Sequence, residues 1–307
     1  MRTWILGAAL LALTPTAFSQ QPTSRTDAAP PPDTDIYLAP LTIVDGRPTV
    51  GTPENITKTP GYDNQPSFTP DGGAVLFTSA RGGKQTDIYR YDISTRQTTR
   101  VTNTPESEYS PTITPDRQHI SVIRVEADQT QRLWQFTLDG TDPTLVLSDI
   151  KPVGYHAWLD DHTLALFVLG QPATLQIADT KTGKAEIFAR DIGRSIQRIP
   201  TADAVSFVQR EAPSEAGAPP ILWIRAFDLR VRQITELVRA VTGAKEADTA
   251  WMPDGMVLMA FKDTLYGWKL GQRDWLNLAD LGALGLHNVT RLAVSPRGDR
   301  IALVVGP

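Results

Sequence analysis

The sequence has no cysteine among its 307 residues, so it can form no disulfide and carries no cysteine for lipid attachment. It also lacks a strong charge of either sign. Its 30 basic and 34 acidic side chains give a formal net charge of -4 and are interspersed, which argues against a nucleic-acid partner. A Gly-x-Ser-x-Gly nucleophile elbow is missing, and the four histidines follow no short metal-binding spacing. The sequence motifs that would reveal a serine hydrolase or a zinc site are therefore absent.

No apolar run reaches the roughly 20 residues that a membrane-spanning helix requires. The longest run near the start, residues 4–13, follows the basic Arg2 and precedes the small residues of Ala17-Phe18-Ser19. This order is typical of a cleavable signal peptide over residues 1–19, with a membrane anchor as the alternative. Residues 20–34 are rich in proline and alanine and predict an extended linker. We therefore expect a periplasmic or secreted protein without a membrane span.

A repeat dominates the remaining chain, whose 41% apolar content, 24 prolines and 22 glycines suit a globular fold with many turns. Residues 65–72 (QPSFTPDG) are matched 45 residues later by residues 110–117 (SPTITPDR), and each copy precedes a short apolar run. The segments ITKTP at 56–60 and VTNTP at 101–105 precede the two copies at the same distance. The match thus extends beyond a single tetrapeptide.

Four further copies bring the number of hairpins to six. In each, a strand leads through a tight turn into a second strand, because Pro presets φ, Asp caps the turn and Gly permits a positive φ. These copies are AWLDD at 157–161, PTAD at 200–203, AWMPDG at 250–255 and VSPRG at 294–298.

A second family of strand pairs alternates with the hairpins. Five pairs lie between consecutive hairpins, and a sixth precedes the first one, so the chain opens on an outer pair and ends on an inner pair. Joining the two ends would complete a blade and close a ring without exposed sheet edges. The five pairs are 87–92 with 98–102, 133–136 with 144–147, 174–178 with 185–189, 222–227 with 233–237, and 265–270 with 274–278; the sixth comprises 34–37 and 47–50 before 55–57.

We therefore predict an all-β fold over residues 35–307, a six-bladed β-propeller of four-stranded blades. Its closing blade takes outer strands from about residues 35–57 and inner strands from about residues 290–305. An open β-sandwich or two stacked domains would also use short strands, but a repeat that ends in mid-unit fits only a closed array. Such a ring is expected to be a monomer.

The hairpin Thr-Pro-Asp-Gly, followed by Asp-Ile-Tyr at 87–89 and Val-Thr-Asn-Thr at 101–104, resembles the PD40 repeat of TolB-type propellers. The resemblance covers residues 35–307 and is strongest in the first two units and at residues 251–255. It implies either an envelope scaffold or a propeller that gates substrates for an attached peptidase. TolB carries an α/β domain before its propeller, for which this sequence has no room, so the interface of that domain cannot be transferred.

The default binding surface of a propeller is the face where the chain enters its inner strands. We expect tyrosine, histidine, arginine and carboxylate side chains to converge there. An Asp before such a strand can instead bond backbone N–H groups of the next blade, and we favour this for Asp63 and Asp248. The candidate binding residues are Asn64, Glu108, Tyr109, Tyr155, His156, Arg194, Glu246, Asp248 and His287.

These residues favour a non-enzymatic protein that binds an envelope protein or peptide, with no cofactor. The alternative is a metal-assisted hydrolase or lyase with His156 or His287 as base. Ca²⁺ or another divalent ion could then use His156, Glu108, Glu246 and Asp248, although no spacing motif supports it. A sugar stacked on Tyr155 or Trp158 is a third possibility.

Overall fold

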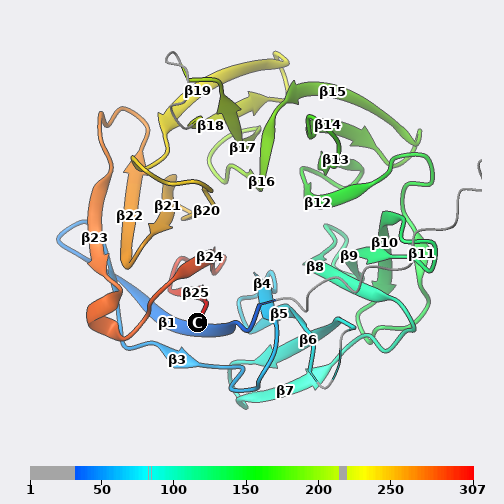
Figure 1. Ribbon diagram of the computed structural model, residues 1–307, viewed down its shortest axis with the longest axis horizontal. Helices are drawn as coiled ribbons and strands as arrows, with labels where there is room; N and C mark the ends of the chain where they lie inside the picture. The colour runs from blue at the N-terminus through cyan, green and yellow to red at the C-terminus, as the bar shows by residue number, and fades with distance from the viewer. Residues whose placement is uncertain (1–31, 82, 84, 214–219) are drawn as a thin grey trace, which may run out of the picture. The chain divides into compact units, whose positions relative to one another are not determined.

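The computed structural model describes residues 32–81, 83, 85–213 and 220–307, and these form the six blades of a β-propeller (Figure 1). The signal peptide proposed at residues 1–19 lies outside the described residues, as does the centre of the long connection after Pro213. None of the described helices is both long and apolar enough to cross a membrane.

Five blades consist of four consecutive antiparallel strands, with the first strand of each nearest the central axis (Figure 1). Blade 1 contains β4 (Asp63–Phe68), β5 (Ala74–Ser79), β6 (Asp87–Asp92) and β7 (Gln97–Arg100), and blade 2 contains β8 (Ser107–Ile113), β9 (His119–Val125), β10 (Gln131–Thr137) and β11 (Thr144–Leu145). Blade 3 contains β12 (Val153–Trp158), β13 (Thr163–Val168), β14 (Thr174–Asp179) and β15 (Lys184–Arg190), and blade 4 contains β16 (Ile192–Arg198), β17 (Ala204–Glu211), β18 (Ile221–Asp228) and β19 (Gln233–Arg239). Blade 5 contains β20 (Thr249–Trp251), β21 (Met256–Phe261), β22 (Thr264–Lys269) and β23 (Leu276–Asp280), followed by a 3-10 turn η1 (Gly282–Leu284).

The sixth blade joins the two ends of the propeller, as the repeat predicts. Its inner strands are β24 (Val289–Val294) and β25 (Arg300–Val305), and its outer strands are β1 (Asp35–Val44), β2 (Arg47–Val50) and β3 (Glu54–Asn55). β1 pairs antiparallel with β25, from Asp35 opposite Val305 to Pro40 opposite Arg300. The closed ring is therefore confirmed, and its closure depends on hydrogen bonds between segments more than 250 residues apart.

Burial changes systematically across each blade. The second strand is the most deeply buried, because both of its faces pack against neighbouring blades; all six residues of β5 (AVLFTS) are buried. The outermost strands face solvent, and the first four residues of β15 are exposed. The innermost strands β4 and β12 are only partly buried, so several of their side chains are available to a ligand.

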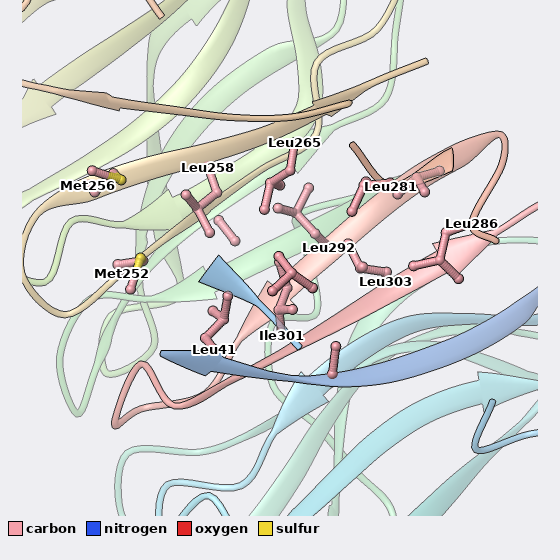
Figure 2. Close-up of a cluster of buried hydrophobic side chains, with 14 residues drawn as sticks. Leu41, Met252, Met256, Leu258, Leu265, Leu281, Leu286, Leu292, Ile301 and Leu303 are labelled. Atoms are coloured by element: carbon pink, nitrogen blue, oxygen red, sulfur yellow. The ribbon is translucent and has the colours of Figure 1, made fainter. Parts of the chain in front are cut away.

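Apolar clusters fill the seams between neighbouring blades. In the seam of blades 5 and 6, Leu258 and Leu265 of blade 5 meet Leu41 of β1 and Ile301 and Leu303 of β25 (Figure 2). The two ends of the propeller thus share one core as well as one sheet.

The hairpin turns form as their residue types predict. Thr69 Oγ1 donates to Asp71 Oδ1 at 2.6 Å, and the Gly73 N–H donates to the same oxygen at 2.9 Å. Gly72 has a φ of 69°, and Arg117 at the same place in blade 2 has a φ of 59°. The second hairpin therefore places a non-glycine residue in the left-handed region.

Candidate functional site: the central channel

The inner strands of all six blades line a central channel of about 420 Å³. Counting back four residues from the first turn residue of each hairpin identifies one channel-lining residue per blade. We call these six residues the entrance ring: Gln65, Ser110, Tyr155, Ser195, Asp248 and Arg291. Because each occupies the same repeat position, the ring gathers one side chain from each blade around one axis.

Two arginines and one aspartate lie together at this ring. Arg194 donates to Asp248 Oδ2 from Nε at 3.1 Å and from Nη2 at 2.6 Å. Burial alone would lower the pKa of Arg194, but the facing Asp248 carboxylate outweighs it and the pKa is raised. Arg291 Nη1 lies 3.8 Å from Asp248 Oδ1, which permits attraction but is too long for a hydrogen bond. One carboxylate therefore faces two guanidinium groups.

Arg291 also contacts Tyr155. Its Nη2 donates to the Tyr155 hydroxyl at 2.6 Å, and its guanidinium carbon lies 5.1 Å from the centre of the Tyr155 ring. Gln65 Nε2 approaches the same hydroxyl at 3.5 Å. Two donors thus point at the hydroxyl oxygen, which leaves the Tyr155 O–H hydrogen to be donated elsewhere.

A second tyrosine, Tyr62, interacts electrostatically with Tyr155 and with Arg291. Burial raises the pKa of Tyr62 to about 12, against the lowering effect of Arg291 and Arg194, while Tyr155 and Tyr109 raise it further. Tyr62 is therefore a neutral hydrogen-bond donor at ordinary pH.

Gln65 and Ser110, in the first two inner strands, have a strained backbone conformation. Both have positive φ values, 56° and 54°, and each is followed by proline. Gln65 Oε1 accepts the Ser110 N–H at 2.9 Å and the Thr78 hydroxyl at 2.8 Å. This glutamine therefore fixes blade 2 to blade 1, and its carbonyl oxygen is already used.

His156 lines the channel but its ring turns into the seam of blades 2 and 3. Its Nε2 lies 2.7 Å from Ser121 Oγ, which also accepts Trp158 Nε1–H at 2.9 Å and donates to the Thr112 carbonyl at 3.1 Å. Burial lowers the pKa of His156 to about 4, so the ring is neutral. Buried Nδ1 has no hydrogen-bond partner among the described residues.

The opposite end of the channel is more apolar. One residue before each turn, five of the six lining positions carry apolar or aromatic side chains. We call this set the turn-side ring: Phe68, Ile113, Trp158, Arg198, Trp251 and Val294. The channel thus has a polar entrance and a largely apolar end.

The structure brings four of the predicted binding residues to the channel, namely Tyr155, His156, Arg194 and Asp248. The other five lie elsewhere. Asn64 is buried beside Thr34, Glu108 bonds Thr102 inside the blade 1 and 2 seam, Tyr109 packs on the blade 2 and 3 core, Glu246 pairs with Arg210, and His287 pairs with Asp263. Each of these five is held by partners that explain it without a channel ligand.

The expectation that Asp63 and Asp248 bond backbone N–H groups of the next blade is wrong. Asp63 accepts from the Thr59 hydroxyl at 3.0 Å, and Asp248 accepts from Arg194. The backbone role belongs to neighbouring residues: Ser195 Oγ accepts the Thr249 N–H at 3.1 Å. The Asp63 and Asp248 carboxylates both lie where an inner strand begins, and both accept hydrogen bonds from side chains.

The four proposed metal ligands are not gathered at one point. His156, Glu108, Glu246 and Asp248 each bond to a different partner, as given above. Within the part of the chain that the structure describes, no group of three or more His, Cys, Asp or Glu side chains could hold a metal ion.

Arg291 and Gln65 are functional candidates that the sequence reasoning missed. In blade 6 the sequence pattern indicated His287. β24 begins at Val289 and bulges before Arg291, so Arg291 is the residue that lines the channel. Aligning all six hairpins on their turns would have identified both positions.

The closed ring of six blades around a lined channel defines the fold class as a six-bladed β-propeller. Residues 35–158 match the family described as the TolB beta propeller domain. No curated protein matches the chain. The fold is thus that of a six-bladed β-propeller, and its first part is similar to the TolB propeller family.

Solved structures share this fold at low sequence identity. A protein described as TolB of Agrobacterium tumefaciens has a TM-score of 0.67 at 15% identity, covering 90% of this chain and 99% of that one. TolB from Acinetobacter baumannii has a TM-score of 0.57 at 14% identity, covering 89% of this chain, which spans only 64% of that TolB. An oligogalacturonate lyase in complex with manganese has a TM-score of 0.56 at 13% identity, covering 83% of this chain and 80% of that one. At these identities the likeness concerns the fold.

Proposed function

We propose that this propeller is an exported, non-enzymatic binding protein that engages a protein or peptide partner of the cell envelope through its channel face. The observation that supports this most is the entrance ring, where polar side chains from six blades surround an open channel of about 420 Å³. Tyrosine and arginine are the residues most often decisive in protein recognition, and both occur there. Export rests on the signal-peptide pattern of residues 1–19.

The chemistry of the channel favours binding over catalysis. Ser121 and His156 lie 2.7 Å apart, as a nucleophile and its base would, but Ser121 is fully buried and therefore out of reach of a substrate. Asp248, the acidic residue of the channel lining, is held by Arg194. The lyase neighbour shares the fold, and the grouping of side chains here gives no reason to transfer its reaction.

Site-specific photocrosslinking tests the proposal. A photoreactive amino acid at Gln197, which lines the channel, is expected to capture a partner in intact cells. The same amino acid at Arg230, an exposed turn residue with 82% side-chain exposure, serves as the control. Crosslinks that form equally from both positions, or only from position 230, would contradict binding at the channel face.

Export is tested on the full-length chain with a C-terminal tag. We expect recovery in the periplasmic or secreted fraction at a mass reduced by the signal peptide. Uncleaved protein in the cytosol would overturn this part of the proposal.

A further inference from the structure

We infer that the ligand group that enters the channel is a carboxylate of a peptide. This inference rests on the proposed function and names the chemistry that the entrance ring would recognise. It follows from the charge of the channel, from its excess of hydrogen-bond donors and from its apolar end.

The charge of the channel is opposite to that of the protein. Three arginines line it, Arg194, Arg198 and Arg291, against the one carboxylate of Asp248. The chain as a whole carries a formal charge of -4. At the entrance, Arg194 and Arg291 face the single carboxylate of Asp248, with side chains 33%, 13% and 11% exposed, so one excess positive charge is partly shielded from water there. Arg198 is exposed and belongs to the turn-side ring. A partly buried charge without a matched partner is stabilised by an incoming anion.

The hydrogen-bond capacity of the entrance points the same way. Asp248 is occupied by Arg194, and Gln65 Oε1 by Ser110 and Thr78. On the donor side, no acceptor lies within reach of the Tyr155 O–H hydrogen among the described residues, and Arg291 bonds only Tyr155. The entrance therefore offers donors and has few acceptors left, so its ligand must bring acceptors. A carboxylate does so with two oxygens and a charge.

A peptide fits the rest of the channel better than an acidic sugar does. Sugar hydroxyls are donors as well as acceptors, and the entrance has few acceptors to receive them. The turn-side ring, at the other end of the channel, presents Phe68, Trp158 and Trp251, which suit an apolar part of a peptide that extends through the channel from the carboxylate. The sugar-stacking alternative is weakened further because Arg291 lies over the Tyr155 ring.

A peptide array probed with the purified, tagged protein tests the inference. Each short synthetic peptide is presented with a free or an amidated C-terminus, and with Asp and Glu retained or replaced by Asn and Gln. We expect binding only by peptides that keep a carboxylate and that also contain apolar residues. Loss on amidation would identify a C-terminal carboxylate as the source, and loss on side-chain replacement would identify an acidic side chain.

Affinity measurements on the best peptide then test the residues. Arg291→Gln should weaken binding at least about 30-fold, the effect of truncating a buried charged hydrogen bond worth about 2 kcal/mol. Tyr155→Phe, which removes only the hydroxyl, should weaken it by about 5-fold or more and guards against misfolding of the first variant. Arg230→Gln makes the same charge change at an exposed turn and should leave binding unchanged.

The outcomes separate the inference from the proposed function. Equal binding of carboxylate and amide forms, with capture still occurring at Gln197, would overturn the carboxylate and leave channel binding intact. Absence of any peptide binding, or Arg291-dependent binding of oligogalacturonate in its place, would overturn the peptide carboxylate. Absence of channel crosslinking would contradict the proposed function itself.

Discussion

The channel entrance and the seam of blades 5 and 6 use opposite chemistry. The seam holds a cluster of buried apolar side chains, among them Leu258, Ile301 and Leu303 (Figure 2). The entrance sets two arginines against one aspartate and leaves the Tyr155 hydroxyl hydrogen without an acceptor. The seam has the composition expected of a structural core, and the entrance has that of a site kept incomplete for a ligand.

This difference predicts which substitutions unfold the protein and which impair only binding. Changes in a seam should lower the free energy of unfolding, while changes at the entrance should lower affinity with little effect on the fold.

Deletion of residues 293–307 should have the largest effect, because it removes β25 and leaves β1 without its partner. Both ends of the ring then become open sheet edges. We expect the loss of cooperative unfolding, or a melting temperature lowered by more than about 10 °C, in a circular-dichroism melt. An unchanged melting curve would show that the ring does not depend on its shared blade.

Leu258→Ala should destabilise the protein by about 2–5 kcal/mol, because it opens a cavity in the fully buried seam. Ile43→Ala is the matched control, since Ile43 is an aliphatic residue of β1 that is 55% exposed, and it should change stability by less than about 0.5 kcal/mol. Urea unfolding measures both. Similar effects of the two variants would refute the assignment of the seam as the structural core.

Glu108→Gln should remove a pH dependence that originates in the seam of blades 1 and 2. Burial raises the pKa of Glu108 from 4.5 to about 7, although Thr104, Thr102 and Arg124 lower it. The folded state therefore holds this proton more tightly than the unfolded state, and its stabilising effect is complete below pH 4.5 and lost as the pH rises to about 7.

The expected loss for the native protein over this interval is about 1–3 kcal/mol. The glutamine variant keeps a neutral group in the same place, so its stability should vary less between pH 4.5 and pH 7. Urea unfolding across this range measures the difference. Parallel pH profiles of the two proteins would show that folding does not raise the pKa of Glu108.

The sequence was sufficient to predict the fold because each blade repeats a local signal. The turn residues Thr69, Asp71 and Gly72 specify a hairpin by short-range hydrogen bonds, and the incomplete repeat units at the two ends specify the closure. Such signals do not require knowledge of distant contacts.

The site could be predicted only in part, because its partners come from different blades. Asp248 lies 54 residues from Arg194, and Tyr155 lies 136 residues from Arg291. Sequence alone places each near the start of a strand but does not say which side chains meet. A bulge in β24 also moves the channel position of blade 6 from the expected His287 region to Arg291. Irregularities of this kind depend on packing between blades.

The central claim is that the charge of the channel entrance serves a ligand and not the fold, and Arg291→Gln tests it most directly. The measurement is the free energy of unfolding of this variant and of the native protein in urea, both without ligand. Because Asp248 keeps Arg194 as its partner, we predict values within about 1 kcal/mol of each other. A loss of about 3 kcal/mol or more would show that Arg291 completes a buried structural pair, and would contradict the account.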